Sequence, residues 1–143
     1  YFKREIVFVN AFAANDPEST GRIWESMLEK YGKDRRKIVL INCRADRPHR
    51  SQQMAEDAVK WSEADKYLLM GSGTFIFVRN AVKYGLDPEK LLVMENAQMT
   101  EITETILEES GSSALVVGMC NIHGGGEEVA RFFQNRAIKE EDL

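Results

Sequence analysis

Apolar and polar positions alternate along the chain in a way that predicts an α/β fold. Short apolar runs of strand length are each followed by a longer amphipathic segment of helix length, and this unit occurs five times. The predicted strands are 6–10, 38–42, 67–70, 91–94 and 114–118, and the predicted helices are 17–31, 51–62, 74–84, 99–109 and 126–134. Such alternation is typical of a parallel sheet with helices on both faces. We therefore predict a Rossmann-like, doubly wound fold whose mainly parallel sheet has about five to six strands.

Length and composition are those of one soluble globular domain, residues 1–143. Apolar residues make up 43% of the chain and charged residues 29%, without a repeat or a low-complexity tract. The formal charge of -4 argues against a nucleic-acid partner, because duplex binders usually need a basic face. Cys43 and Cys120 are far apart and belong to no CxxC pair, so we predict buried thiols and no disulfide or zinc site.

The ends and the apolar runs of the chain bear on its context. No apolar run approaches the roughly 20 residues that a membrane-spanning helix requires, and no signal peptide is recognisable. The chain starts directly with a strand at residues 4–9 and lacks an initial methionine. We therefore expect a domain excised from a longer protein.

Polar and glycine-rich segments follow four of the predicted strands. They are residues 13–20, 43–50, 71–74 and 121–126. Because the carboxyl ends of parallel strands meet at one edge of the sheet, these segments should lie together where open α/β sheets bind ligands. Their shared location predicts a binding site.

The first of these segments contains a helix start. Asp16 before Pro17 is an ordinary beginning of a helix, with aspartate as the N-cap and proline at the first helical position. Capping alone explains this pair. In a second interpretation, Asn15 and Ser19 additionally hold a ligand carboxylate or phosphate at the helix start, where free N–H groups and the dipole favour an anion.

The second segment contains three arginines around one aspartate. Arg44, Arg47 and Arg50 surround Asp46 within seven residues, and three guanidinium groups repel one another unless an anion joins them. The forked guanidinium binds carboxylate and phosphate through two hydrogen bonds, and Asp46 could orient one guanidinium or receive a ligand amine. The alternative is a solvated surface ion-pair cluster. The pattern favours ligand binding.

Glycines and one histidine characterise the other two segments. In residues 121–126, glycines let the backbone approach a ligand closely, and His123 could bind a phosphate or steady a neighbouring loop. Residues 71–74 form either a phosphate or adenylate contact or a tight turn into a helix. The chain has no GxxxxGK[ST] phosphate loop and no GxGxxG fingerprint. With His49 as the second histidine, a histidine-rich metal site is not expected.

Three motifs in order carry a family resemblance. Residues 9–20 read VNAFAANDPEST, residues 41–47 read INCRADR and are followed by Gln52-Gln53, and residues 121–124 read NIHG. Together they closely resemble the carboxyl-terminal part of the ligase subunit of poly-gamma-glutamate (capsule) synthase, over almost the whole chain. That family is similar to the Mur ligases and folylpolyglutamate synthases, whose third domain is Rossmann-like, receives the incoming amino acid and closes over ATP held by a central domain.

The resemblance also implies roles for single residues. The Asn15-Asp16 loop is similar to the aspartate-tyrosine-alanine-histidine loop of the Mur ligases, with Ala14 in place of the histidine. Asp46-Arg47 resembles their aspartate-arginine segment, and His123 the histidine of their glycine-lysine-glycine-histidine turn, of which the lysine is missing. The implied catalytic residues are Asp46, Arg47 and His123. The implied substrate-binding residues are Asn15, Asp16, Ser19, Arg44, Arg50, Asn121 and Gly124.

The activity implied by the resemblance is ATP-dependent amide ligation. A glutamate γ-carboxylate becomes an acyl phosphate, which the amine of the next glutamate attacks; the arginines fit the carboxylates or the acyl phosphate, and Asp46 or Asn15 orients the amine. ATP and Mg²⁺ are held mainly by the amino-terminal region, so this domain alone should be inactive. The implied partners are that region, glutamate, the polymer and small membrane subunits, with a cytoplasmic domain and the parent protein at the cytoplasmic face of the membrane.

Two other classes of function compete with ligation. The chain could be a free-standing nucleotide- or anion-binding module of doubly wound fold, which would bind ATP without a partner domain. It could also be a non-catalytic interaction domain, which requires an exposed apolar patch of several hundred Å². Neither the enantiomer of glutamate nor the oligomeric state can be read from the sequence.

Overall fold

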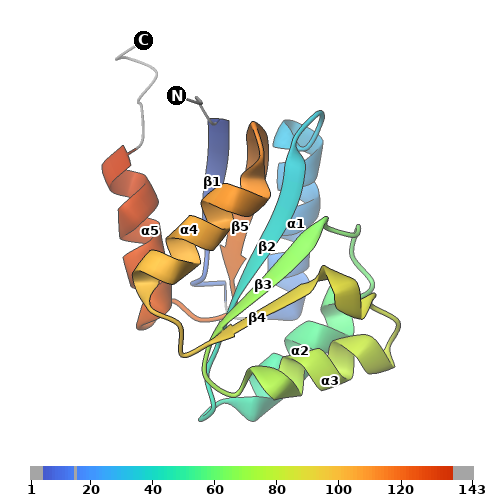
Figure 1. The fold of residues 1–143 in the computed structure, drawn as a ribbon. Coiled ribbons are helices and arrows are strands. Elements are labelled where there is room, and N and C mark those ends of the chain that lie inside the picture. The colour runs from blue at the N-terminus through green and yellow to red at the C-terminus, as the bar shows by residue number, and fades with distance from the viewer. Residues whose placement is uncertain (1–4, 15, 137–143) are drawn as a thin grey trace.

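The computed structural model describes residues 5–14 and 16–136, which form an open α/β fold (Figure 1). Its strands are β1 (Glu5–Ala11), β2 (Arg36–Cys43), β3 (Lys66–Gly71), β4 (Leu91–Glu95) and β5 (Ser113–Met119). Its helices are α1 (Pro17–Tyr31), α2 (Pro48–Ala58), α3 (Thr74–Lys83), α4 (Met99–Ser110) and α5 (Gly125–Arg136), with a short 3-10 helix η1 (Pro88–Lys90). The strands form one sheet in the order β1-β5-β2-β3-β4, and every pair is parallel. The predicted fold class is confirmed.

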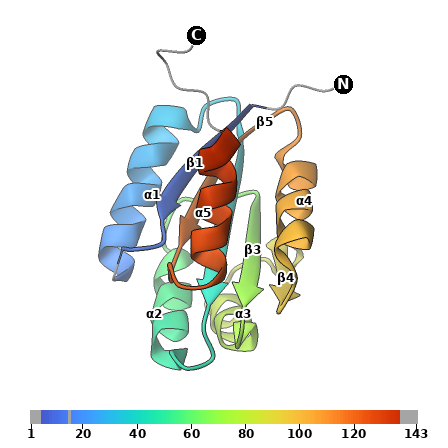
Figure 2. The ribbon, with the colours of Figure 1, turned by 90° about the vertical axis from the view of Figure 1, so that its left-hand side faces the viewer.

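Helices cover both faces of the sheet because its central strands are apolar on both sides. In β2, Val39 and Ile41 pack with side chains of α1, α2 and α3, whereas Ile38 and Leu40 pack with side chains of α4 and α5. The first cluster contains Trp24, Met54 and Phe77, and the second contains Ile102, Ile106 and Val129. Figure 2, seen from the β1 side, shows α1 and α2 on one side of the sheet and α4 on the other. Period-2 burial on two faces thus produces the near-continuous apolar strands seen in the sequence.

The strand order creates a switch point at β5. Its neighbours β1 and β2 continue into α1 and α2 on one face, while β5 itself continues into α5 on the opposite face. The loops at the carboxyl ends of these three adjacent strands therefore leave in opposite directions. Such a divergence opens the crevice in which doubly wound sheets bind their ligands.

Helix α2 differs from its predicted bounds of 51–62. It begins at Pro48, whose fixed backbone suits the first helical position, and it ends at Ala58. The residues that follow are drawn toward α1: the Trp24 indole donates to the Ser62 carbonyl at 2.8 Å, and the Ser62 N–H donates to Glu25 at 3.1 Å. Tertiary contacts with α1, which sequence periodicity does not report, end the helix early.

Candidate functional site

The three arginines of the β2–α2 loop have different partners. Arg44 binds Asp46 through two hydrogen bonds, from Nε to Oδ1 at 3.0 Å and from Nη2 to Oδ2 at 2.7 Å. These bonds hold the pKa of Asp46 below its usual value. Arg50 turns away from them, and its Nη1 lies 3.5 Å from the carbonyl oxygen of Cys120 and 3.3 Å from Oδ1 of Asn121. Arg47 is exposed, and within residues 5–14 and 16–136 its side chain makes no hydrogen bond or ion pair.

The start of α2 is open to an anion. Arg47 is the N-cap residue, Pro48 follows, no side chain caps the helix, and its first turn contains no acidic residue. The free N–H groups of the first turn therefore point toward solvent beside a cationic loop. A carboxylate or phosphate placed there would meet the positive end of the helix dipole and the Arg47 guanidinium together.

At the start of α1, by contrast, the helix carries its own anion. Asp16 Oδ1 accepts a hydrogen bond from the Ser19 N–H at 2.7 Å, and Oδ2 accepts one from the Ser19 hydroxyl at 3.0 Å. These bonds lower the pKa of Asp16. The capping interpretation of this motif is thereby confirmed for Asp16, and Ser19 is its partner. Asn15, predicted to bind substrate, lies outside the described residues.

Glu95 fills the corresponding position at the start of α3 and was not among the predicted residues. Its Oε1 accepts hydrogen bonds from both the N–H and the hydroxyl of Thr74, each at 2.8 Å, and the N–H bond is the main reason why its pKa is lowered. The residue ends β4, where the register places it beside Gly71. In the sequence, the signal that could have identified Glu95 as a site residue is its position at the end of an apolar strand. The turn at 71–74 is therefore closed by an internal carboxylate, which favours the tight-turn interpretation over a phosphate contact.

The same turn is bonded to the β2–α2 loop, residues 44–47, which we call the arginine loop. The Ser72 N–H donates to the Cys43 carbonyl at 3.0 Å, and the Ser72 hydroxyl accepts from the Ala45 N–H at 2.9 Å. Gly71 adopts φ +88°, and a Cβ atom there would lie 2.1 Å from the Cys43 carbonyl oxygen. Glycine is required at this close approach.

The β5–α5 loop divides into a buried and an exposed part. Asn121 is buried, and its amide donates to the Asn42 carbonyl at 2.7 Å. His123 is exposed, with Nδ1 4.0 Å from Glu127, and Gly124 adopts φ +70° with open space around it. The loop thus presents His123 and Gly124 to solvent while Asn121 holds its base.

Both cysteines close the base of this region. Cys43 and Cys120 are buried, as predicted, and burial raises the pKa of each thiol to about 12. They are therefore protonated packing groups at neutral pH. In the part of the chain that the structure describes, no group of three or more His, Cys, Asp or Glu side chains is placed to hold a metal ion.

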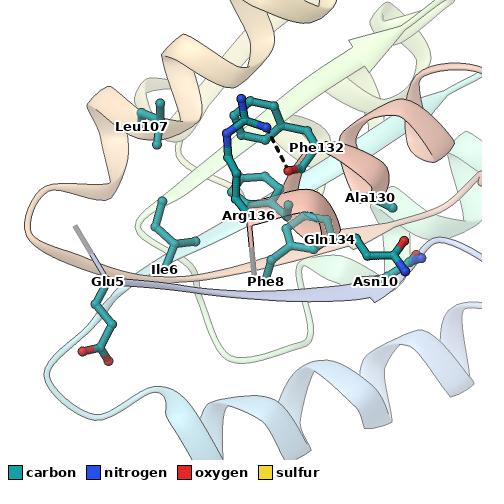
Figure 3. A pocket seen from close by; sticks show the side chains of 10 residues that line it. Glu5, Ile6, Phe8, Asn10, Leu107, Ala130, Phe132, Gln134 and Arg136 are labelled. Atoms are coloured by element: carbon teal, nitrogen blue, oxygen red, sulfur yellow. Dashed lines mark hydrogen bonds between the residues drawn. The ribbon is translucent and has the colours of Figure 1, made fainter. Parts of the chain in front are cut away.

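Hollows are also present on the surface of the described part of the chain. One of about 400 Å³ lies at the carboxyl edge beyond β3, between the β4–α4 loop and the start of α5, and is lined by Asn96, Gln98 and Glu128 among others. Another of about 790 Å³ lies between β1, α4 and α5 (Figure 3). There Phe8 stacks on Phe133 at 4.5 Å, and none of the predicted site residues lines the hollow. We place the site at the carboxyl edge because the charged and polar groups converge there.

The fold is that of a doubly wound α/β domain, with the three arginines of the β2–α2 loop at its switch point. The chain belongs to the family described as the poly-gamma-glutamate synthase CapB C-terminal domain, whose model matches residues 1–136. It is 34% identical over 133 residues to PGA synthase CapB of Bacillus subtilis (strain 168), covering 93% of this chain and 34% of that protein. It is also 33% identical over 131 residues to the capsule biosynthesis protein CapB of Bacillus anthracis, covering 92% and 28%. The family resemblance is confirmed, and the chain spans about a third of the length of these relatives.

Proposed function

We propose that this domain is the carboxyl-terminal, substrate-binding part of an ATP-dependent amide ligase that builds poly-gamma-glutamate for capsules. Family membership and the names of the two relatives support the polymer and the capsule. The ligase chemistry is supported by the resemblance to the Mur ligases and by the arginines of the β2–α2 loop. In this reaction an acyl phosphate of the γ-carboxylate is attacked by the amine of the next glutamate.

The observation that carries the proposal is the uncommitted Arg47 at the uncapped start of α2. Glutamate brings carboxylates, and an acyl phosphate brings further negative charge, so both need fixed cationic donors. Arg47 offers a free fork of N–H groups, and the first turn of α2 offers backbone N–H groups beside it. The helix fixes its N–H groups before the ligand arrives, so they stabilise the charge without reorganising, and the exposed Arg47 adds a forked cationic donor beside them.

The other predicted residues receive supporting roles. Asp46 holds Arg44 in place by two hydrogen bonds, and its remaining lone pairs are available to the incoming amine. His123 and Gly124 lie in the β5–α5 loop and are exposed to solvent. Asp16 and Ser19 cap the start of α1 through their hydrogen bond. Arg50 donates to Asn121 and so connects the first turn of α2 to the β5–α5 loop.

The residues described do not by themselves fit a complete ATP and Mg²⁺ site. The starts of α1 and α3 are occupied by Asp16 and Glu95, and the first turn of α5 contains Glu127 and Glu128, which repel a triphosphate. The proposal therefore assigns ATP and Mg²⁺ to the amino-terminal region of the parent protein, and the isolated domain is expected to be inactive.

Membrane partners belong to the same proposal. We assign the parent protein to the cytoplasmic face of the membrane, beside small membrane subunits of the synthase. Within residues 5–14 and 16–136, no helix combines the length and the apolar character needed to cross a bilayer.

Substitution of Arg47 tests the proposal. In the full-length parent protein, Arg47→Ala should lower kcat/KM for glutamate-dependent polymer formation about 100-fold or more, because a cationic donor to the developing negative charge is lost. The matched control is Arg79→Ala, which removes an exposed arginine of α3 that has no side-chain hydrogen bond in the described part of the chain. Circular dichroism and thermal unfolding should show an intact fold for both. Activity equal to that of the control would contradict the proposal and favour the alternative interpretation of these arginines as a solvated surface ion-pair cluster.

The open start of α2 also supports the second candidate, a free-standing anion-binding module. In that case the 143-residue domain should bind ATP unaided, which calorimetric titration would detect. For the interaction-domain alternative, the exposed large apolar side chains are Phe75, Val82, Tyr84 and Val93, on or beside α3 and on the edge strand β4.

A further inference from the structure

Two buried asparagines at the switch point bond to each other in both directions. Asn42 lies at the end of β2 and Asn121 lies just after β5, and each is only 3% exposed. The Asn42 amide donates to the Asn121 carbonyl at 2.8 Å, and the Asn121 amide donates to the Asn42 carbonyl at 2.7 Å. The pair extends the contact between two parallel strands past the point where their loops diverge.

Further bonds connect this pair to both sides of the candidate site. The same Asn42 amide donates to the His123 carbonyl at 3.0 Å, and Arg50 of α2 reaches Oδ1 of Asn121 at 3.3 Å. One amide group therefore holds two carbonyl oxygens of the β5–α5 loop, and that loop in turn is held to the first turn of α2. Displacement of either loop would break several buried hydrogen bonds at once.

Two glycines pack closely against the asparagine pair. A Cβ atom on Gly126 would lie 2.6 Å from the Asn121 carbonyl oxygen and 3.3 Å from the Asn42 amide nitrogen, and one on Gly71 would lie 2.8 Å from Asn42 Oδ1. Cys120, between β5 and Asn121, adopts φ +93°, a conformation that costs a non-glycine residue free energy. The loop turns sharply here, and the asparagine bonds hold the turn in place.

We infer that Asn42 and Asn121 are positioning residues that fix the distance between the arginine loop and the His123 loop across the crevice. This inference rests on the proposed function, because it concerns the same site. Neither amide needs to touch substrate: both are buried, both NH2 groups donate to backbone carbonyl oxygens, and Oδ1 of Asn121 accepts from Arg50. The pair acts on the reaction through the placement of Arg47 and His123.

Replacement of Asn42 by its isosteric acid separates positioning from simple stabilisation. In Asn42→Asp a carboxylate oxygen faces the two carbonyl oxygens that the amide bonded, so the loops must separate. In the full-length parent protein, well below its unfolding temperature, we expect kcat for polymer formation to fall about 10-fold or more, because misplaced groups lose effective molarity. KM for ATP should change less than twofold.

Asn80→Asp is the matched control. Asn80 of α3 also donates its amide to a backbone carbonyl, that of Ile76 at 2.7 Å, but it lies outside the site. The control loses the same kind of bond and should keep its kcat. Asn121→Asp is the milder companion variant, because its carboxylate keeps the contact with Arg50 while it loses the donation to Asn42. If Asn42→Asp does not fold, Asn121→Asp should still show a fall in kcat that the control lacks.

Hydrogen exchange tests the geometry without the reaction. Both site variants should exchange the amides of the paired strand ends next to the asparagines, residues 41–43 and 117–119, at least about 10-fold faster than wild type, whereas Asn80→Asp should not. Unchanged exchange there, or a kcat equal to that of the control, overturns the inference. If Arg47→Ala leaves polymer formation intact, the proposed function fails while the exchange result still decides whether the asparagines hold the loop.

Discussion

The starts of α2 and α3 follow neighbouring strands of the same sheet, yet they are prepared for different partners. At α3, Glu95 supplies a carboxylate to the N–H and hydroxyl groups of Thr74, so the helix dipole is already balanced by the protein. At α2, no side chain caps the helix, and Arg47 stands free beside it. The difference teaches that a helix start indicates ligand binding only when the fold has not filled it with an anion of its own.

The largest expected effect tests whether the turn before α3 is rigidly built. Gly71→Ala should destabilise the domain by about 3 kcal/mol or more, because the new Cβ combines positive φ with a clash against the Cys43 carbonyl. Gly85→Ala is the control, since Gly85 has φ +110° but no atom within 4 Å of its Cβ position. It should cost only the strain of about 1–2 kcal/mol. Equal losses in urea unfolding would show that the turn yields easily.

An anion titration compares the two helix starts directly. Inorganic phosphate added to the domain should shift the backbone amide signals of residues 49–51, which follow Pro48 at the start of α2, in ¹H–¹⁵N spectra, with a Kd on the order of millimolar. The amides of residues 74–76 should shift much less, because Glu95 occupies that helix start. Arg47→Ala should weaken the first response. Similar shifts at both starts would remove the distinction between them.

The smallest effect concerns acid stability at α3. The lowered pKa of Glu95 means that its charged form stabilises the fold above its ordinary pKa of 4.5, and this contribution is lost as pH falls through the lowered value. Glu95→Gln should therefore be slightly less stable than wild type at neutral pH, with the difference shrinking below pH 4.5. Urea unfolding at a series of pH values measures it. Glu101→Gln, at an exposed position in the first turn of α4, is the control and should show no comparable loss.

Sequence periodicity predicted the fold because the central strands are buried on both faces and the helices on one. Residues such as Ile38 to Ile41 form an apolar run that only a sheet covered on both sides accommodates, and all five predicted strands and helices are present. The early end of α2 was missed, because contacts of Ser62 with α1 join residues far apart in the sequence.

The local sequence determined which charged and polar side chains lie at the carboxyl edge of the sheet. The arginines of one loop, the capping aspartate of another and the histidine of a third all follow apolar strands. Only the tertiary structure decided how that chemistry is used. Arg50 meets Asn121 across 71 positions of sequence, and Thr74 meets Glu95 across 21, because strand order brings separate loops together. Hydrogen bonding is short-ranged and directional, so the partner of a polar group depends on its neighbours in space. That is why composition marks three arginines alike, while the fold leaves Arg47 free and engages the other two.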